Sequence, residues 1–228
     1  NEPPVKYFLM GANKWCTAQQ WPPEDSSRVT YYLHSGGRAN SLLGDGLLST
    51  QPPEDEPADQ FTYDPQNPAP FAIQSDEQVI LDQRVVERRD DVLVYTTTPL
   101  AEDVTVVGPI HAKIYASSSA ADTDFVAKLV DVHPSDIAVF LTIGVIRARY
   151  RTSFEKPTFI EPGVVYEYDI DMSNTANQFK KGHRIRLEVS SSAFPYFLKN
   201  QNTGNDTGTD TDSAVARQGI YHNHDCRS

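Results

Sequence analysis

The residues best suited to hydrolytic chemistry are a serine run and a nearby histidine. Ser190, Ser191 and Ser192 follow an alternating apolar stretch, and His183 precedes that stretch. A serine nucleophile needs a general base, a carboxylate that orients the base, and an oxyanion hole. In many hydrolases it also sits on a sharp turn with the pattern GxSxG, which this chain lacks. The sequence therefore predicts no catalytic residue within this chain.

Acidic residues suggest calcium as a second kind of chemistry. Aspartates lie in the polar loop 203–213 and beside Thr123, namely Asp206, Asp210, Asp212, Asp122 and Asp124. Calcium needs about six to eight oxygen ligands, and an EF-hand loop also needs a glutamate at its twelfth position. Arg217 occupies that position when Asp206 is counted first. A solvated loop is the favoured interpretation.

The end of the chain offers another set of metal-ligand types. His222, His224 and Asp225 could bind a metal, but a strand end followed by a frayed tail explains them better. Cys16 and Cys226 lie near opposite ends of the sequence and fit neither a disulfide framework nor a CxxC motif. Two free thiols are predicted, although the cysteines could pair if the ends of the chain meet. No metal or other cofactor is predicted.

Size and charge limit the classes of partner. With 228 residues, a formal net charge of −11 and a sequence pI of about 4.9, the chain can form one domain with a substantial core. The negative charge opposes binding to nucleic-acid phosphates and anionic membranes. No apolar run approaches the roughly 20 residues that cross a bilayer. Neither nucleic acid nor membrane is predicted as a partner, and the cellular compartment stays open.

Many short strand-like segments must position these side chains. Apolar runs with a period of two are separated by Pro- and Gly-rich turns, as in 92–95, 104–107, 110–114, 123–132, 137–141, 144–150, 164–170, 185–189 and 214–221. Apart from short turns around 173–179, no helix is expected. Close spacing of strands without intervening helices predicts an all-β, mostly antiparallel sandwich that forms a single domain over 1–228.

Several strands carry more specific expectations. In the segment 123–132, Phe125, Ala127 and Leu129 alternate with Val126, Lys128 and Val130, so the strand is predicted to be central and buried on both faces, with Lys128 reaching outward. In 184–189, apolar and charged residues alternate, which predicts a half-buried strand with one charged face. The apolar run 5–10 is predicted to be a buried first strand. Gly108-Pro109 is expected to separate two strands.

Arginines and tryptophans mark two further candidate surfaces. Arg147, Arg149 and Arg151 alternate along one predicted strand, and a solvated or interdomain face is favoured over an anion site. Trp15 and Trp21 are interpreted as core or interdomain packing residues, with ligand stacking as the alternative.

Several ordered motifs extend over nearly the whole chain. They include MGANKW (10–15), YYLHSGGRANSLLGDGLLS (31–49), DQFTYDPQNPAP (59–70), DQRVVERRDDVLVYTTTPL (82–100), SSSAADTDFVAKLVDVHP (117–134), GVIRARYR (144–151) and FKKGHRIRLEVSSSAFPYF (179–197). In this order they resemble the C-terminal domain of CocE/NonD serine hydrolases, the X-Pro dipeptidyl-peptidase-like and cocaine esterase-like group.

The resemblance implies a fold and a place in a longer protein. The fold would be a jelly-roll-like (galactose-binding-like) sandwich, C-terminal to an α/β-hydrolase domain that holds the catalytic Ser, Asp and His. The whole protein would cleave a small acyl ester or a peptide such as an X-Pro dipeptide. Domains of this group usually end with one more apolar strand, so the chain is expected to stop before that strand. A homo-oligomer is left open.

The resemblance also indicates where this domain meets substrate. The segment 71–81 is shorter than the Gly-rich loop of the resembling hydrolases, which lies near the acyl pocket. Phe71, Ala72 and Ile73 are therefore predicted at the edge of that pocket, with simple loop packing as the alternative. The rival function is a carbohydrate-binding module, because β-sandwiches of this kind also bind sugars.

Overall fold

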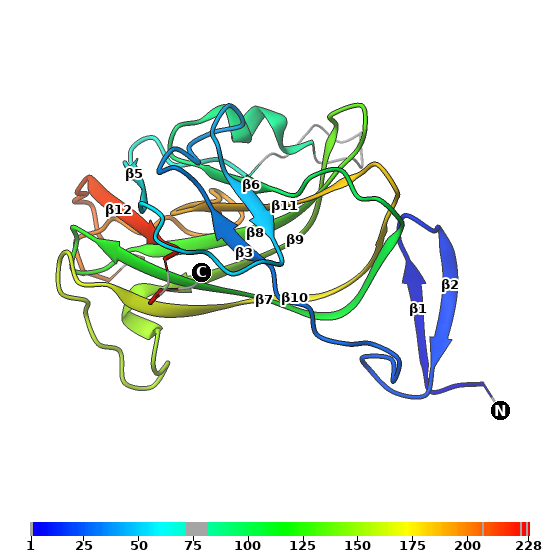
Figure 1. Cartoon of the computed structure of the whole chain (residues 1–228). Coiled ribbons are helices and arrows are strands. Elements are labelled where there is room, and N and C mark those ends of the chain that lie inside the picture. The colour runs from blue at the N-terminus through cyan, green and yellow to red at the C-terminus, as the bar shows by residue number, and fades with distance from the viewer. Residues whose placement is uncertain (1, 72–81, 207, 224, 227) are drawn as a thin grey trace.

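Two β-sheets pack face to face and a separate hairpin stands beside them (Figure 1). The structure is a computed structural model, and it describes residues 2–71, 82–206, 208–223, 225–226 and 228. The four-stranded sheet has the order β10 (Tyr166–Phe179), β7 (Val104–Ser118), β12 (Ala216–Tyr221) and β5 (Asp59–Tyr63). The six-stranded sheet has the order β3 (Tyr32–His34), β4 (Leu47–Ser49), β6 (Leu93–Thr96), β11 (Arg184–Ser190), β8 (Asp124–Val132) and β9 (Ala138–Arg147).

The predicted all-β, jelly-roll-like sandwich is confirmed. Apart from the parallel contact between β4 and β6, the described strand pairs are antiparallel. The core lies between the inner faces of the two sheets. It includes Phe125 and Leu129 from one sheet and Ile114, Tyr168 and Ile170 from the other. Burial of these apolar side chains is the main force that holds the layers together.

Strand β8 is central, as predicted, but the expected direction of Lys128 is wrong. All nine residues of β8 are buried, and β8 lies between β11 and β9. The Lys128 side chain is only 2% exposed and forms an ion pair with Glu188. A lysine this deep needs a partner, because an uncompensated buried charge is costly.

The prediction of a half-buried β11 is also wrong. Arg186 and Glu188 on its charged face are as buried as the apolar residues Ile185 and Val189 on the other face. A short 3-10 helix, η1 (Gln83–Arg88), covers the charged face and supplies the buried residue Glu87, which pairs with Arg186. Sequence periodicity did not predict η1, since six residues are too few to show a helical repeat.

Strands β7 and β10 are longer than expected. Gly108-Pro109 lies inside β7 and does not end it, because β12 pairs with β7 only at residues 115–118. The missing N–H of Pro109 therefore interrupts no ladder to β12. The turns expected around 173–179 are instead part of β10, where a bulge between Asp171 and Asn174 holds Ser173 at φ 64°.

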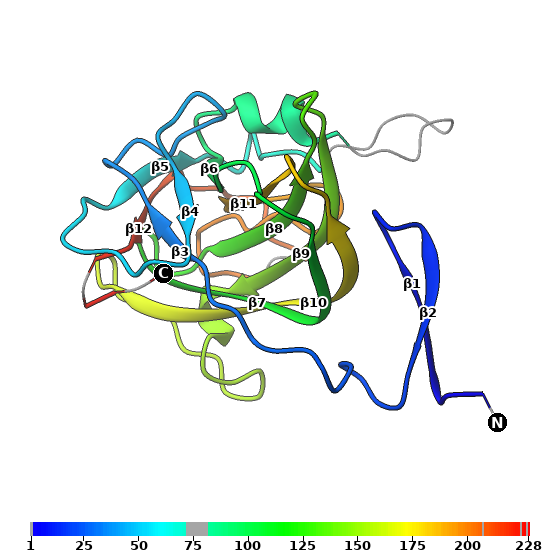
Figure 2. The same cartoon turned by 45° about the vertical axis from the view of Figure 1, so that its right-hand side comes forward.

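The hairpin of β1 (Val5–Leu9) and β2 (Lys14–Ala18) corrects the prediction of a buried first strand. It projects from the sandwich in two views (Figures 1 and 2), and Met10 in its turn joins it to β10 by backbone hydrogen bonds with Ala176 and Gln178, both 2.9 Å long. Phe8 is 40% exposed and Trp15 is 66% exposed. Trp21 donates its indole N–H to Asn174 of β10 at 2.7 Å. Both cysteines are free, as predicted. Within the described residues, no helix is long and apolar enough to cross a membrane.

Candidate functional site

The outer face of the six-stranded sheet carries the candidate site. Because side chains of a strand alternate between faces, Val126 and Val130 of β8 point away from the core that holds Phe125 and Leu129. The cross-strand partner of Val126 on β9 is Val145, which continues this face to the edge of the sheet. An apolar outer face of this kind is stable only when other residues shield it from water.

Part of the cover is an aromatic surface formed by Phe71, Phe140, Phe194, Tyr196 and Phe197. The Phe71 backbone N–H donates to the Phe194 carbonyl oxygen at 2.8 Å, which joins two segments far apart in the sequence. The Phe71 ring packs edge-on against Phe140 at 5.2 Å and stacks on Tyr196 at 4.6 Å. These are favourable aromatic geometries.

The aromatic surface is only partly covered by the chain itself. Phe71 is 8% exposed, whereas Tyr196 is 56% exposed and the adjacent Leu198 is 69% exposed. Contiguous exposed apolar side chains commonly mark a contact surface for another domain or a ligand. Of the three residues predicted at a substrate edge, Phe71 therefore lies at such a surface. Ala72 and Ile73 lie outside the described residues.

Two buried ion pairs lie beneath the same face. Lys128 pairs with Glu188 directly across from it, and Arg186 contacts Glu87 at 2.6 Å. Burial raises the pKa of Glu87 to about 7, and the negative charge of Glu188 adds to this, while Arg186 opposes it. Gln83 accepts a hydrogen bond from the Lys128 ammonium at 2.9 Å. The centre of the outer face therefore carries charged side chains that are shielded from solvent.

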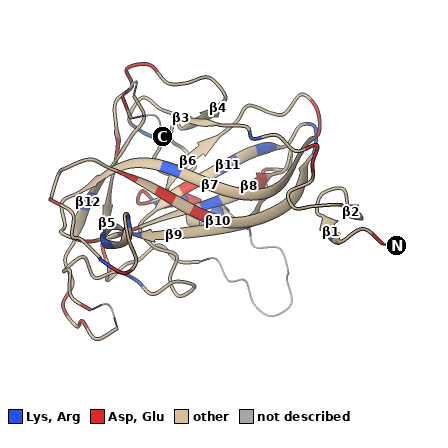
Figure 3. Ribbon diagram, turned by 90° about the horizontal axis from the view of Figure 1, so that it is seen from below, with Lys and Arg blue, Asp and Glu red and all other residues tan. Residues whose placement is uncertain are grey.

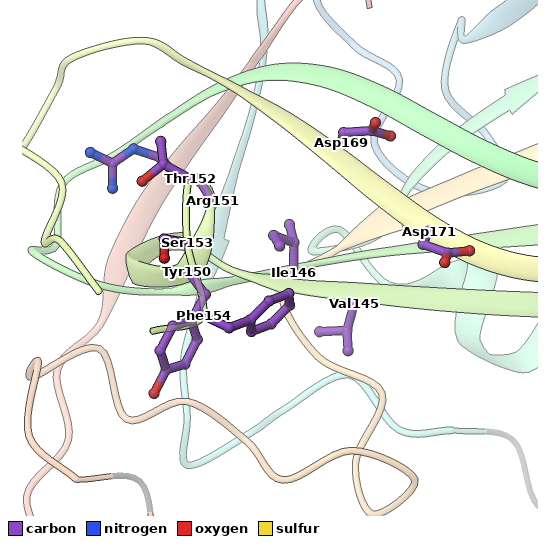
Figure 4. A pocket seen from close by; sticks show the side chains of 9 residues that line it. All are labelled: Val145, Ile146, Tyr150, Arg151, Thr152, Ser153, Phe154, Asp169 and Asp171. Carbon is purple, nitrogen blue, oxygen red and sulfur yellow. The ribbon is translucent and has the colours of Figure 1, made fainter. Parts of the chain in front are cut away.

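An open hollow of about 240 Å³ lies at the end of β9 (Figure 4). Tyr150 and Phe154 stack with ring centroids 5.7 Å apart and form one wall. Asp169 and Asp171 of β10 lie across from the aromatic pair. All nine lining residues are described and none is a histidine, so the hollow lacks the usual general base of a serine hydrolase.

The serine run and His183 do not form a catalytic pair. They lie at opposite ends of β11, and seven residues of extended strand span about 23 Å. Ser190 is buried and donates its hydroxyl hydrogen to the Ser192 carbonyl oxygen at 3.0 Å. That no residue of this chain is catalytic stays a prediction.

The structure does bring together one serine, histidine and aspartate set that the sequence did not indicate. His222 Nε2 lies 2.9 Å from an Asp59 carboxylate oxygen and 3.2 Å from Ser35 Oγ. Ser35 donates its hydroxyl to the same Asp59 oxygen at 2.7 Å. A catalytic triad needs the histidine between serine and acid, whereas here the aspartate accepts from both. The set is a buried structural network.

The hydrogen bonds of this network lower the pKa of Asp59. Burial alone would raise the pKa of the Asp59 carboxyl, but hydrogen bonds from His222, the Ala39 amide, Tyr95 and Ser35 lower it below its usual value. Tyr95 donates to Asp59 at 2.7 Å, and burial raises its own pKa well above the usual range. Asp59 is therefore held as a carboxylate that ties β5 to β6 and to the end of the chain.

Three of the aspartates considered for calcium are used in local contacts. Asp124 pairs with Arg147 at 2.8 Å, and Asp122 pairs with Arg149 at 2.9 Å. Burial raises the pKa of Asp124, although Arg147 acts in the opposite direction. Asp210 accepts a hydrogen bond from Thr203. The arginine side chains at 147 and 149 thus contact internal carboxylates and are less solvated than expected.

A different set of metal-ligand types converges at the other end of the sheet. One oxygen of Asp131 and one nitrogen each of His133 and His183 lie within 4.8 Å of one another. The sequence analysis missed this cluster. The sequence signal for the cluster was Asp131-x-His133 at the end of one strand and His183 just before its antiparallel neighbour. These residues can be recognised as a cluster only when the register between the two strands is known.

The fold and the site define a class. The class is a β-sandwich domain of two packed sheets that carries a half-covered aromatic surface, and its Ser35, Asp59 and His222 form a buried structural network. A family model for the X-Pro dipeptidyl-peptidase C-terminal non-catalytic domain matches residues 1–228. The chain belongs to this family, the C-terminal domains of X-Pro dipeptidyl-peptidase and CocE/NonD hydrolases.

Known proteins that match are longer than this chain. Cocaine esterase from Rhodococcus sp. (strain MB1 Bresler) is 44% identical over 207 residues, which are 89% of this chain and 36% of the esterase. An aminopeptidase from a marine-sediment Thaumarchaeota archaeon has a TM-score of 0.89 at 28% identity, and the match covers 99% of this chain and 39% of that one. An α-amino acid ester hydrolase has a TM-score of 0.87 at 28% identity, and the match covers 99% of this chain and 40% of the hydrolase chain.

Proposed function

We propose that this chain packs against an α/β-hydrolase domain that lies upstream in the same polypeptide, and that the whole protein cleaves esters or amides through a serine nucleophile. The chain spans about two fifths or less of the relatives that it matches. The names of those relatives, an esterase, an aminopeptidase and an ester hydrolase, share the hydrolysis of an acyl bond. These matches support a companion role for this chain.

The observation that carries the proposal is the half-covered aromatic surface around Phe71. Rigid aromatic side chains stacked on a β-sheet offer a large apolar contact area with little loss of conformational entropy. Against a catalytic domain, this surface would close one side of the acyl pocket and exclude water from it. Phe71 is the residue proposed to lie at the pocket edge.

The first experiment asks where the catalytic serine lies. The complete protein and the 228-residue chain alone are each treated with a fluorophosphonate probe that labels activated serines. Labelling of the complete protein alone is expected, because the proposal assigns the nucleophile to the upstream domain. Labelling of this chain by itself would overturn the companion role.

The second experiment tests the pocket edge. Phe71→Ala is placed in the complete protein, and kcat/KM is measured for a series of esters of increasing acyl length. Because each buried methylene contributes about 1–3 kcal/mol to discrimination, the ratio between long and short acyl chains should change by about tenfold.

Phe154→Ala is the matched control for that experiment. It removes an equally large aromatic ring, 80% exposed, from the hollow beyond β9. The control should leave the ratio between long and short acyl chains unchanged. A Phe71→Ala variant with every relative rate unaltered would refute the pocket assignment and leave Phe71 as a packing residue.

A further inference from the structure

Three metal-ligand side chains meet where the turn between β8 and β9 lies beside the turn between β10 and β11. Asp131 lies in β8 and His133 directly follows its last residue, Val132, and their ligand atoms lie within 4.8 Å of each other. In the antiparallel ladder Arg184 pairs with Val132, which brings His183 next to His133. The two imidazole rings lie 4.4 Å apart between centroids.

Both histidines are held by the backbone of their turns. The His133 N–H donates to the Ile137 carbonyl at 2.9 Å, and the His183 N–H donates to the Lys180 carbonyl at the same distance. Gly182, at φ +83°, permits the tight turn before His183. The ligand atoms are therefore brought together by the fold and do not depend on flexible tails.

The carboxylate of the cluster is oriented from the opposite sheet. Asn177 of β10 is buried, and its side-chain amide donates to Asp131 Oδ2 at 3.3 Å. The other oxygen, Oδ1, lies 2.8 Å from His183 Nδ1. Asp131 is 4% exposed, whereas both histidines are half-buried. A buried, oriented carboxylate with histidines on the solvent side provides both an outer hydrogen bond and an entry path.

We propose that Asp131, His133 and His183 form a binding site for a divalent transition-metal ion, with zinc as the best match. Two imidazoles and one carboxylate are a common ligand set for zinc, and water would complete a tetrahedron. Ligand atoms around tetrahedral zinc lie about 3.4 Å apart, so the cluster, whose ligand atoms lie within 4.8 Å of one another, needs only small side-chain adjustments to hold the ion.

A bound ion would displace the proton shared between His183 and Asp131 and join the β8–β9 turn to the β10–β11 turn. Its effect is expected to be structural, because the hollow described above lies at the opposite end of β9 and no residue of this cluster lines it. Binding should therefore raise the thermal stability of the protein, since an ion that binds only the folded state stabilises it.

The test is zinc titration of the complete protein after chelator treatment, followed by calorimetry. The wild-type protein should bind one more zinc ion than the His133→Ala/His183→Ala variant. Asp131→Asn should weaken the affinity at least tenfold, and cobalt(II) should give visible absorption bands only when both histidines are present. His133→Gln, a milder change at a half-buried position, serves if the double variant does not fold.

The matched control is His111→Ala. His111 also contacts an aspartate, Asp169 at 3.2 Å, but His111 does not belong to the cluster of Asp131, His133 and His183. Zinc binding should be unchanged in this variant. Equal zinc stoichiometry and affinity in the wild type and the double variant would overturn the proposed site, as would an equal rise in melting temperature on adding zinc.

Discussion

The outer faces of the two sheets carry the same kind of ion pair in opposite environments. On the four-stranded sheet, Lys113 and Glu167 lie 2.9 Å apart with about half of each side chain exposed. Figure 3 shows acidic residues gathered along β10 on this face. On the six-stranded sheet, Lys128 and Glu188 form a pair that is 2% and 0% exposed. Both pairs join neighbouring antiparallel strands.

The difference arises from segments that are remote in sequence. Helix η1 and the segments around Phe71 and Phe197 cover the six-stranded sheet, whereas the β10 face alternates between buried core residues and exposed charged residues. A surface pair contributes little to stability, while a buried pair is costly to break. The covered face is also the face that carries the aromatic surface. We therefore expect stability and interdomain contact to depend on this sheet.

Breaking the buried pair should have the largest effect. Lys128→Ala leaves Glu188 as an uncompensated buried charge, which is expected to lower the free energy of unfolding by about 3–5 kcal/mol. Lys113→Ala, in the exposed pair, should cost at most about 1 kcal/mol. Urea unfolding of both variants measures the difference. Equal losses of unfolding free energy in the two variants would show that the two ion pairs do not differ in environment.

The pH dependence of stability should come next. The folded pKa of Glu87 is raised to about 7 from 4.5, so the folded protein holds this proton more tightly than the unfolded chain. The stabilisation is therefore present below pH 4.5 and is lost as the pH rises through about 7. Between about pH 5 and about pH 8, wild type should lose on the order of 1–3 kcal/mol relative to Glu87→Gln.

The control for the pH experiment is Glu167→Gln on the exposed face. A hydrogen bond from Lys113 and a weaker contribution from a hydrogen bond of Tyr115 lower the pKa of Glu167, so this carboxyl does not titrate between about pH 5 and about pH 8 as Glu87 does. The Glu167→Gln variant should follow the wild-type pH profile. A Glu87→Gln profile parallel to wild type would show that Glu87 is not the titrating group.

Replacing the buried pair by apolar residues should have a smaller effect than removing one partner. In Lys128→Met/Glu188→Leu, no buried charge is left alone, so the free energy of unfolding should stay within about 1 kcal/mol of wild type. The comparison with Lys128→Ala in the same urea series separates the cost of an unpaired charge from lost packing. A loss as large as that of the single variant would assign the effect to packing.

The smallest effect is expected at the edge of the aromatic surface. Leu198 is 69% exposed, so Leu198→Ser should change the stability of the chain itself by less than about 0.5 kcal/mol. Urea unfolding of the chain alone provides the measurement. A loss above about 1 kcal/mol would mean that this position is packed within the domain and is not part of a free contact surface.

Much of the fold could be predicted because strand formation depends on local sequence. The alternation in 184–189 and the apolar residues on both faces of 123–132 identified strands that the structure contains as β11 and β8. Breaks were less predictable. Pro109 continues a strand because β12, the neighbour on one side of β7, does not extend that far, and residues 173–179 form part of a strand that contains a bulge.

The candidate site was less accessible to sequence reasoning. Phe71 was identified through resemblance to a family, and its partners Phe140 and Tyr196 come from segments far apart in the chain. The buried position of Lys128 depends on Glu188 directly opposite it and on Gln83 of η1 above it. A charged residue in an apolar strand can reach solvent or a buried partner, and local sequence is the same in both cases.

By itself, the sequence determined the strand content, the absence of a GxSxG elbow and membership in a family, because these depend on local patterns and on ordered motifs. Only the tertiary structure decided which charged face is buried and that Asp131, His133 and His183 meet. The physical reason is that a period of two assigns side chains to two faces of a strand but does not show what covers each face. Cover and cross-strand register come from contacts between residues that are distant along the chain.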